Sequence, residues 1–519
     1  MELRLEWKKL QNGSDIRGVA LDINPEEKVN LNPQVANTIA KAFTIWLSQV
    51  TGKESSSLSI AVGADSRLSG PAIKNSAISG ISALGSSVSD CGIASTPAMF
   101  MSCVLPGFEF DGSIMITASH LPANRNGMKF FTGNGGLEKK DITEILNIAQ
   151  SIEGKPDGSE NAGNGIITEI DLISAYSDNL VKIIRESANS KINFKRPLEG
   201  LKIIVDAGNG AGGFFVDKVL KVLGADTTGS QFLEPDGRFP NHIPNPEDKT
   251  AMESIKSAVI SNRADFGIIF DTDVDRAGAV DKYGREINRN SLIALMSAIV
   301  LEDYPGSTIV TDSITSAELK VFIEEKLGGI HHRFKRGYKN VINEAIRLNS
   351  FGIQSHLAIE TSGHGALKEN YFLDDGAYLI AKMLVKIAKL NEQGKTIDLL
   401  IEDLKEPLES MEFRLSINSE NFKECGEKIL SDLQNYASNE LTWQIAPDNF
   451  EGVRVSFDDK NGNGWFLLRM SLHDPLMPLN IESNNSGGIR EIGVKILEFL
   501  SAYECLETKT LRNFVSKIE

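Results

Sequence analysis

The sequence predicts an α/β protein in which strands and helices alternate along most of the chain. Short apolar runs end in polar loops, and helix-like stretches over residues 32–49, 212–223 and 317–326 lie between them, a pattern typical of mostly parallel sheets. The polar loops begin near Asp65, Ser119, Asp206, Asp271, Asp312 and Glu360. After Pro407 the pattern changes to strand-like alternation from Met411 to Ile417, which predicts a smaller α+β domain.

The length of the chain predicts several domains. A chain of 519 residues exceeds what one ordinary hydrophobic core supports. Boundary signals are a Gly- and Asn-containing segment over residues 154–165, a turn at residues 281–284 and Pro407. The predicted domains are residues 1–160, 161–287, 288–406 and 407–519.

The charge balance limits the classes of partner. The chain carries 54 basic and 70 acidic residues, for a net charge of −16, which disfavours nucleic acid and anionic membranes as partners. The longest strongly apolar run, residues 292–301, is about half as long as a membrane span requires. We expect a monomer or a small homo-oligomer.

The N-terminus and the cysteines predict a cytoplasmic location. The first seven residues are charged throughout and contain no apolar core of a signal peptide. The cysteines are scattered, show no metal-binding spacing and indicate a reducing compartment. They are Cys91, Cys103, Cys425 and Cys505.

The first candidate functional loop carries Ser119. An apolar strand over residues 114–116 leads into it, Pro122 stiffens it, and Lys129 follows ten residues after the serine. Loops at the carboxyl ends of strands in open α/β sheets converge on ligand sites. A serine in a turn also commonly hydrogen-bonds its own backbone. Ser119 alone can therefore be either a functional residue or a structural residue of the turn.

The second loop places Asp271, Asp273 and Asp275 at alternate positions. Three carboxylates at this spacing repel one another unless a cation lies among them. Oxygen ligands without Cys or His nearby favour Mg²⁺, Ca²⁺ or Mn²⁺ over zinc. The loop is not an EF-hand, because Arg276 and Lys282 occupy the positions of the required Gly and Glu. The alternative to a metal site is a solvated acidic turn.

The third loop carries Glu360, Ser362 and His364 around glycines, again after a short apolar strand. Carboxylate and hydroxyl groups in such a loop are suited to holding sugar hydroxyls. A histidine at this place can equally be structural.

Taken together, these motifs resemble those of the α-D-phosphohexomutase superfamily, which holds phosphoglucomutase, phosphomannomutase and phosphoglucosamine mutase. The matching segments occur in the family's order and span nearly the whole chain. They are residues 14–18, 63–67, 117–122, 126–129, 206–213, 235–246, 271–276 and 360–364, with Leu121 as a departure in the serine motif. The resemblance implies three similar mixed or parallel-sheet α/β domains and a smaller C-terminal α+β domain around a central cleft.

The resemblance also implies the catalytic roles. Ser119 would carry the phosphoryl group, and Asp271, Asp273 and Asp275 would hold one Mg²⁺ together with a phosphoserine oxygen. Lys129 would act as the acid/base. The groups contacting the transferring phosphoryl group would be His120 and Arg276.

Substrate contacts are implied on several loops. The residues that would hold sugar hydroxyls are Glu360, Ser362 and His364, and those that would line the cleft are Arg17 and Lys339. The phosphate-binding residues would be Arg469 and Ser471. The four domains would then be phosphoserine-bearing, metal-binding, sugar-binding and phosphate-binding, in chain order.

The phosphate-binding motif is where the chain departs from the family. Arg469, Ser471 and Pro475 match, but His473, Asp474 and Pro478 stand where the family has Thr, Glu and a second Arg. One guanidinium that would clamp a phosphate is therefore missing. Downstream, the Gly-rich segment 483–490 with Arg490 is either an additional anion site or a simple loop and helix N-cap.

Four functions are compared. The favoured one is a reversible mutase of glucose or mannose phosphates that works through a phosphoserine and a hexose bisphosphate, with the bisphosphate as activator. The alternatives are phosphoglucosamine mutase, against which Thr361 argues because glutamine is usual there, and a phosphotransferase that releases the bisphosphate, motivated by Pro478. A non-catalytic phosphosugar-binding protein would not need Ser119, Lys129 and the three aspartates.

Overall fold

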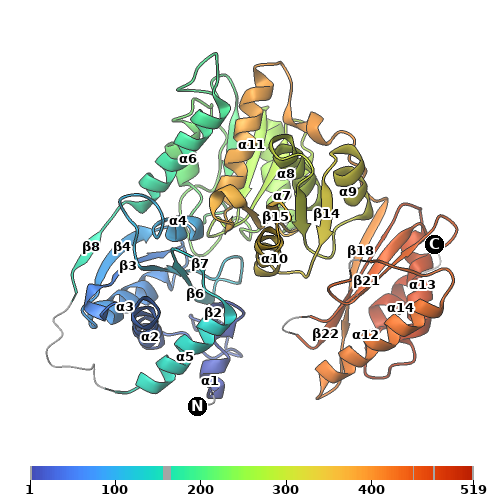
Figure 1. Cartoon of the computed structure of the whole chain (residues 1–519), viewed down its shortest axis with the longest axis horizontal. Coiled ribbons are helices and arrows are strands. Elements are labelled where there is room, and N and C mark those ends of the chain that lie inside the picture. The colour runs from blue at the N-terminus through green and yellow to red at the C-terminus, as the bar shows by residue number, and fades with distance from the viewer. Residues whose placement is uncertain (1–2, 156–164, 448, 472–473, 517–519) are drawn as a thin grey trace. The chain divides into compact units, whose positions relative to one another are not determined.

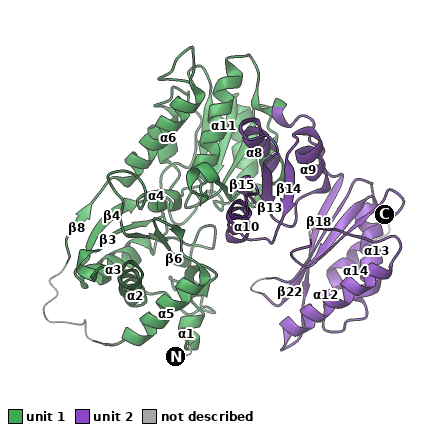
Figure 2. Ribbon diagram, in the orientation of Figure 1, with its two compact units in different colours: residues 1–292, 362–399 green, residues 293–361, 400–519 purple. Residues whose placement is uncertain are grey.

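The computed structural model describes residues 3–155, 165–447, 449–471 and 474–516 (Figure 1). The chain forms two compact units (Figure 2). The first consists of residues 1–292 and 362–399, and the second of residues 293–361 and 400–519.

The largest sheet of the first unit is mixed. Its strands are β1 Gln11–Asn12, β2 Asp15–Val19, β3 Ser59–Ala64, β4 Ser87–Ile93, β5 Gly112–Ile116, β6 Arg125–Thr132, β7 Gly135–Gly136 and β8 Ile167–Glu169. They lie in the order β1-β2-β6-β5-β3-β4-β8, with β7 paired to β6. The run β5-β3-β4-β8 is parallel, whereas β2 and β6 pair antiparallel to their neighbours.

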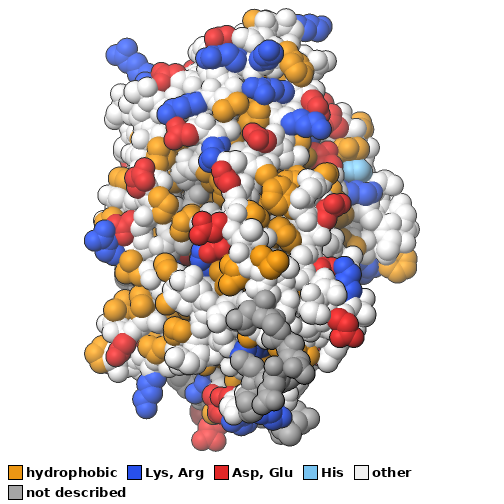
Figure 3. All heavy atoms as spheres, turned by 90° about the vertical axis from the view of Figure 1, so that its left-hand side faces the viewer, with side chains coloured by type: hydrophobic (Ala, Val, Ile, Leu, Met, Phe, Trp, Pro, Cys, Tyr) orange, Lys and Arg blue, Asp and Glu red, His pale blue; other side chains and the backbone are white. Residues whose placement is uncertain are grey.

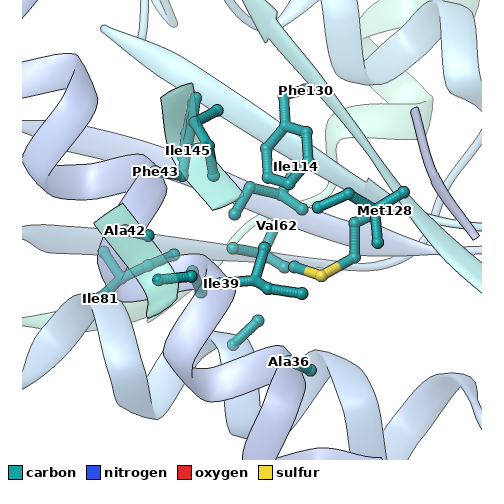
Figure 4. Packing of buried hydrophobic residues seen from close by; sticks show 14 of the residues in the cluster. Ala36, Ile39, Ala42, Phe43, Val62, Ile81, Ile114, Met128, Phe130 and Ile145 are labelled. Carbon is teal, nitrogen blue, oxygen red and sulfur yellow. The ribbon is translucent and has the colours of Figure 1, made fainter. Parts of the chain in front are cut away.

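Helices cover both faces of this sheet. They are α1 Leu5–Lys8, α2 Pro33–Thr51, η1 Ser55–Ser57, α3 Gly70–Ser82, α4 Thr96–Met101 and α5 Lys139–Ile152, followed by α6 Leu172–Ala188. Residues of α2, α3 and α5 share a core with one face, in which Phe43 packs against Phe130 beside Ile114 (Figure 4). Helix α4 packs on β5 and β6, where the Met99 carbonyl accepts from Ser113. Both faces of the central strands are therefore buried.

A second sheet of this unit supports the aspartate loop. Its strands are β9 Ile203–Asp206, β10 Phe266–Phe270, β11 Ala277–Asp281 and β12 Glu286–Ile287, in the order β12-β11-β10-β9. Only β9 and β10 are parallel. The remaining elements here are η2 Phe215–Leu220, α7 Lys249–Asn262, β16 Gly365–Leu367, η4 Lys368–Asn370, β17 Leu373–Asp374, α11 Gly376–Asn391 and η5 Ile397–Ile401, whose last two residues fall in the second unit.

The second unit begins with a parallel arrangement. Strand β13 Thr308–Thr311 pairs with β14 Ile330–Arg333 on one side and with β15 Ser355–Ile359 on the other. The helices around it are α8 Arg289–Asp303, most of which belongs to this unit, α9 Ala317–Val321, η3 Phe322–Lys326 and α10 Tyr338–Ser350.

The C-terminal part is a separate antiparallel sheet. Its strands are β18 Glu409–Ser416, β19 Gln444–Ile445, β20 Val453–Phe457, β21 Gly464–Leu468 and β22 Leu476–Ser483, in the order β18-β22-β21-β20-β19. The helices α12 Phe422–Asn439, α13 Gly488–Leu500 and α14 Lys509–Ser516 share a core with one face of it. The predicted α+β domain after Pro407 is thus confirmed, and the alternation at residues 411–417 is β18.

Two expectations about the regular structure need correction. The sheets are not mostly parallel, because β5 and β10 are each followed directly by an antiparallel neighbour, β6 and β11. The predicted helices 212–223 and 317–326 contain π-helical turns, with Lys221 N–H donating to the Val216 carbonyl at 3.0 Å. Hydrophobic periodicity does not distinguish such turns from an α-helix.

The four-domain division stays a prediction, and its first boundary, at residue 160, lies outside the described residues. Cys425 and Cys505 form a disulfide, which disagrees with the expectation that the scattered cysteines indicate a reducing compartment. Cys91 and Cys103 are free and buried. The two paired residues are 80 positions apart, a contact that spacing alone cannot reveal.

No helix in the described ranges combines the length and apolar character needed to cross a bilayer. On the face of the molecule in Figure 3, basic and acidic side chains are interspersed, and no continuous basic area is visible there. This distribution agrees with the acidic net charge of the chain.

Candidate active site

Ser119 is held in a strained conformation at the end of β5. Its φ of 49° lies in the left-handed region, which costs a non-glycine residue about 1–2 kcal/mol. Its N–H donates to Thr117 Oγ1 at 2.9 Å. Its Oγ donates to Asp271 Oδ2 at 3.0 Å and lies 3.3 Å from His120 Nδ1. The serine is buried, so this hydroxyl is aimed at the aspartate loop and not at bulk water.

Both reactive loops are β-hairpin connections. The Ser119 loop joins β5 to the antiparallel β6, which brings Gly127 and Lys129 back beside the serine. Gly127 has no space for a side chain, because a Cβ there would lie 2.3 Å from the Ile16 carbonyl oxygen and 2.7 Å from that of Thr117. The predicted segment 126–129 is therefore the return strand of this hairpin.

The aspartate loop is the matching hairpin between β10 and β11. Asp271, Asp273 and Asp275 are buried and offer ligand atoms that all lie within 4.8 Å of one another. Val274 has a φ of 68°, a rare value for a β-branched residue. Such strain is typical of functional loops whose geometry the surrounding structure imposes.

This cluster has the donor set of a hard-cation site. Asp273 Oδ1 and Asp275 Oδ1 are buried and have no hydrogen-bond partner in the described structure. Buried carboxylate oxygens in this state are costly unless a cation or donor satisfies them. All the protein ligands are oxygens, which suits Mg²⁺. The solvated acidic turn is excluded as an alternative, because the three side chains are not solvated.

Lys129 extends the cluster with a buried positive charge. Its Nζ contacts Asp273 Oδ2 at 3.1 Å and also pairs with Asp275 Oδ2. Burial lowers the pKa of Lys129, but the two carboxylates outweigh it and raise the pKa well above its ordinary value. For Asp271, burial and the neighbouring carboxylates Asp275 and Asp273 raise the pKa.

Arg276 closes the aspartate loop. Its Nε lies 3.3 Å from Asp271 Oδ2, and its NH1 lies 3.3 Å from Asn245 Oδ1 and 3.5 Å from Glu247 Oε2. The NH2 group is buried and has no hydrogen-bond partner among the described residues. One arm of the guanidinium is thus available for a phosphoryl oxygen.

The pKa values of two histidines of the site are shifted in opposite directions. Burial and the positive charges of Arg276 and His364 lower the pKa of His120 to about 2, so this imidazole is neutral. Burial also lowers the pKa of His364, but Asp374 and Asp275 raise it above its ordinary value overall. His364 Nδ1 lies 2.5 Å from Asp374 Oδ2, and ligand atoms of this pair and Asp275 form a second compact group.

Arg17 and Ser362 also belong to the first unit. Arg17 NH1 donates to the Thr117 carbonyl at 2.6 Å, and its NH2 pairs with Asp15 at 2.8 Å. The predicted cleft residue therefore supports the loop that carries Ser119. Ser362 is buried next to the β16 hairpin.

Glu360 and Lys339 belong to the second unit. Glu360 Oε1 accepts from Gly337 N–H at 2.5 Å, which ties it to the loop just before Lys339 in the first turn of α10. Thr361 needs a correction, because its hydroxyl donates to Asp312 Oδ2 at 2.6 Å. Its side chain has a structural partner, so its identity is a poor guide to the sugar.

The phosphate loop is built around Arg469 in the second unit. Arg469 is buried, with NH1 3.7 Å from Glu451 Oε1 and its backbone N–H donating to the Pro478 carbonyl at 3.1 Å. Ser471 Oγ accepts from Asp474 N–H at 3.3 Å. His473 lies outside the described residues.

The Gly-rich segment 483–490 is a helix N-cap and not an additional anion site. The N–H groups of Gly487 and Ile489 donate to the two carboxylate oxygens of Glu409 at 2.7 and 3.0 Å. Arg490 Nε donates to the Val515 carbonyl at 2.9 Å. The chain's own carboxylate thus takes the amides that an external anion would need.

Several site residues have no signal in the sequence. Thr96, the first residue of α4, donates from Oγ1 to Asp273 Oδ2 at 2.5 Å, although the two are 177 positions apart. Arg276 is contacted by Asn245, which lies in the motif 235–246 to which no role was given, and by Glu247 directly after that motif. Asp374 pairs with His364 and carries no motif signal of its own. Their roles depend on contacts between elements distant in the chain.

Comparison with known proteins agrees with this geometry. Models of the phosphoglucomutase/phosphomannomutase family match residues 8–155 as alpha/beta/alpha domain I, 174–284 as domain II and 288–407 as domain III.

Individual relatives cover most of the chain. A phosphoglucomutase of Neisseria gonorrhoeae is 32% identical over 436 residues, covering 83% of this chain and 86% of its own. A phosphoglucomutase/phosphomannomutase of Thermococcus kodakarensis is 30% identical and covers 94% and 98%. The crystal structure of a phosphoglucomutase/phosphomannomutase family protein from Burkholderia thailandensis aligns with a TM-score of 0.76 at 26% identity, covering 96% and 98%.

Proposed function

The chain belongs to the phosphoglucomutase/phosphomannomutase family, and we propose that it interconverts hexose 1-phosphate and hexose 6-phosphate through a phosphorylated Ser119 and a hexose bisphosphate. It is an isomerase of the phosphotransferase type. The observation that carries the phosphoserine proposal is Ser119 Oγ, buried in a strained loop and 3.0 Å from Asp271, a member of the aspartate cluster in which two carboxylate oxygens have no partner among the described residues.

One Mg²⁺ would be held by Asp271, Asp273, Asp275 and an oxygen on Ser119. When bound, it neutralises charge on the transferring phosphoryl group. The buried oxygens without partners support this assignment. A hexose bisphosphate would act as activator by phosphorylating Ser119.

The transfer itself requires positioning more than covalent chemistry. A hydroxyl oxygen of the bound hexose phosphate forms a bond to phosphorus, the bond from phosphorus to Ser119 Oγ breaks, and the hydroxyl proton leaves to a base. The return step reverses these bonds at the other phosphate of the bisphosphate. The unpartnered NH2 of Arg276 is placed to hold a phosphoryl oxygen, and neutral His120 contacts the same group.

We assign the proton transfer to Lys129. Asp273 and Asp275 now stabilise its ammonium form, so the resting enzyme holds an acid at this position. Lys129 can accept a proton only when these carboxylates are shared with a cation, because that sharing reduces their effect on its pKa. The observed ion pairs thus support Lys129 as an acid/base whose protonation depends on whether the aspartate cluster holds a cation.

Hexose contacts are proposed for three groups of residues. Sugar hydroxyls would be held by Ser362 and His364 of the first unit and by Glu360 of the second unit. Arg17 and Lys339 would add positive charge for an anionic substrate. The Glu360 carboxylate bound to the Gly337 amide and the His364–Asp374 pair support these roles, because both side chains are oriented by a defined partner.

The phosphate that does not react would bind at Arg469 and Ser471, with help from Arg414. In β18 and β22, Arg414 lies directly opposite Pro478, and Arg469 donates its backbone N–H to the same proline on the other side. Arg414 in β18 and Arg469, directly after the end of β21, therefore lie on opposite sides of Pro478. The exposed guanidinium of Arg414 lies 3.9 Å from Asp474 in the phosphate loop. We infer that Arg414 compensates for the arginine that Pro478 replaces.

A second candidate function is a phosphotransferase that releases the hexose bisphosphate as product. Pro478 favours it, since a weaker clamp on the non-reacting phosphate would let the intermediate escape. Phosphoglucosamine is also retained as an alternative substrate, because Thr361 is engaged by Asp312 and does not discriminate. A binding protein without turnover would not need the strained Ser119 loop.

We also propose a cytoplasmic enzyme, monomeric or a small homo-oligomer, whose partner is the phosphorylated hexose and not nucleic acid or membrane. The net charge of −16 supports the part of this proposal that concerns nucleic acid and anionic membranes.

The test is an assay of the purified protein with Mg²⁺ on glucose 1-phosphate, mannose 1-phosphate and glucosamine 1-phosphate, with and without glucose 1,6-bisphosphate. We expect conversion of glucose or mannose phosphate, stimulation by the bisphosphate, and phosphate on Ser119 by intact-mass and peptide analysis. Accumulation of free bisphosphate in proportion to enzyme turnover would favour the second candidate. No conversion together with an unphosphorylated Ser119 would refute the mutase proposal.

A further inference from the structure

The segment 63–67, recognised in the sequence without a role, meets the Ser119 loop in the structure. Arg67 follows the carboxyl end of β3 and is 1% exposed. Within the described residues, all hydrogen bonds of its guanidinium go to backbone carbonyls of that loop. The acceptors are the carbonyls of Ser119, Leu121 at 2.6 Å, Pro122 at 2.8 Å and Arg125 at 3.0 Å.

Asp65 completes a second connection to the serine. Its Oδ2 accepts from Thr117 Oγ1 at 2.7 Å, and Thr117 Oγ1 in turn accepts from Ser119 N–H. Its Oδ1 accepts from the Arg67 N–H at 2.9 Å, and its Oδ2 lies 3.4 Å from Arg67 Nε. Asp65 and Arg67 therefore hold the peptide units on both sides of Ser119.

The segment 235–246 also matches a family motif to which no role was given. It packs against Arg67 and its neighbours. A Cβ on Gly237 would lie 2.4 Å from Leu68 N and 2.7 Å from Arg67 Cα, so a side chain at Gly237 is excluded. The ring of Phe239 lies 5.5 Å from Arg67 Cζ, in a cation–π contact. Arg67 is thus packed on one side and hydrogen-bonded on the other.

We propose that Arg67, together with Asp65, is a positioning residue of the phosphoryl-transfer reaction. It holds Ser119 in the left-handed conformation that keeps its oxygen against Asp271, both before and after phosphorylation. The inference rests on the proposed role of Ser119 as phosphoryl carrier. In the described structure Arg67 forms no hydrogen bond to Asp271, Asp273 or Asp275, and it acts through the loop.

The guanidinium is specifically suited to this task. Its planar fork of five N–H donors reaches four carbonyls at once, whereas a lysine ammonium has three donors on a single atom. A lysine at position 67 would keep the charge but release part of the loop. Since a displacement of about 1 Å of a reacting group costs roughly 10²-fold in rate, the loss should appear in the transfer step.

The experiment compares Arg67→Lys and Thr117→Val with Arg238→Lys as matched control. Arg238 lies in the supporting segment, but its exposed guanidinium pairs with Asp236 and does not touch the loop. The measurements are kcat, KM for glucose 1-phosphate, the rate of Ser119 phosphorylation by glucose 1,6-bisphosphate, and the melting temperature of each full-length protein.

For Arg67→Lys we expect a roughly 10²-fold lower kcat and phosphorylation rate, with KM within about threefold of the wild type. Arg67→Ala should regain part of its activity when methylguanidinium is added, and Arg238→Ala should show no such gain. Thr117→Val removes the hydroxyl that joins Asp65 to Ser119 N–H and leaves Arg67 in place. It therefore tests the same loop should Arg67 variants fail to fold, and it should lower the same two rates.

Equal phosphorylation rates and kcat in wild type, folded Arg67→Lys and Thr117→Val would overturn the positioning role while leaving the proposed function intact. The same conclusion follows if Arg67→Lys raises KM and leaves kcat unchanged. A wild-type protein that never becomes phosphorylated on Ser119 would instead refute the proposed function on which the inference rests.

Discussion

The Ser119 loop and the Arg469 loop hold their charged groups in opposite ways. Around Ser119 the partners are buried and multiple, as with the guanidinium of Arg67 on four carbonyls. At the other loop, Arg414 and Asp474 form a 3.9 Å pair whose side chains are 63% and 60% exposed. The first loop also matches its family motif except at Leu121, whereas the second departs at three positions.

The difference shows what each end of a phosphosugar demands. A reacting oxygen must be placed to within about an ångström, and buried hydrogen-bonded groups supply that accuracy because leaving any of them unpaired is costly. A phosphate that does not react needs only positive charge within reach, which different arginines can provide. We therefore expect changes at Ser119 to affect rate and changes near Arg469 to affect affinity.

The largest effect should come from removing the phosphoryl carrier. Ser119→Ala should lower kcat by at least about 10³-fold, because alanine has no hydroxyl to carry the phosphoryl group. Steady-state assays with circular dichroism will show whether the fold is retained. Ser151→Ala, on the exposed part of α5, is the control and should be normal. Normal turnover of Ser119→Ala would remove Ser119 from the mechanism.

The next effect concerns the aspartate cluster. Asp273→Asn keeps the shape but removes a charge, so it should raise the Mg²⁺ concentration for half-maximal activity by at least about tenfold. The measurement is a Mg²⁺ titration of activity after treatment with a chelator. Asp217→Asn, which loses only a surface pair with Lys221, should titrate like wild type. An unchanged midpoint for Asp273→Asn would contradict the metal assignment.

A smaller effect is expected at the far end of the substrate. Arg414→Ala should raise KM about threefold to tenfold and leave kcat nearly unchanged, with the difference shrinking at high salt because this guanidinium is exposed. Kinetics at two ionic strengths check it, with Arg512→Ala on α14 as control. A fall in kcat without a change in KM would contradict the expectation that the Arg469 loop affects affinity and the Ser119 loop affects rate.

The smallest effect on turnover should come from substituting His242. This residue forms a buried pair with Asp206, and the substitution measures how much that pair contributes to stability. Its Nε2 lies 3.0 Å from both oxygens of Asp206. Burial lowers the pKa of His242, but the hydrogen bond and charge of Asp206 outweigh it, so the pKa is raised above 6.5. The pair's contribution to the free energy of unfolding is therefore full below about pH 6.5 and is lost as pH rises through the raised pKa.

His242→Gln should lower the free energy of unfolding by about 2–4 kcal/mol at pH 6, because it leaves Asp206 without its charged partner. The difference from wild type should shrink toward pH 9. Urea unfolding at several pH values measures both. A constant difference at all pH values would show that His242 acts by shape alone.

Much of the local structure was predictable. The six predicted loops follow β3, β5, β9, β10, β13 and β15, because a short apolar run that ends in polar residues marks a buried strand. The return strands β6 and β11 were not predicted. Residues 125–132 contain charged and polar side chains, and their strand character depends on pairing with β5 and β2.

The sequence by itself determined the α/β class, the reactive loops and the family, because these depend on residue type and order along the chain. Tertiary structure alone decided which charges meet. Thr96 reaches Asp273, Glu409 occupies the amides of the Gly-rich segment, and Arg67 binds the carbonyls of the Ser119 loop. The physical reason is that a buried polar group must find a partner in space, and the sheet hairpins bring together groups that sequence distance keeps apart.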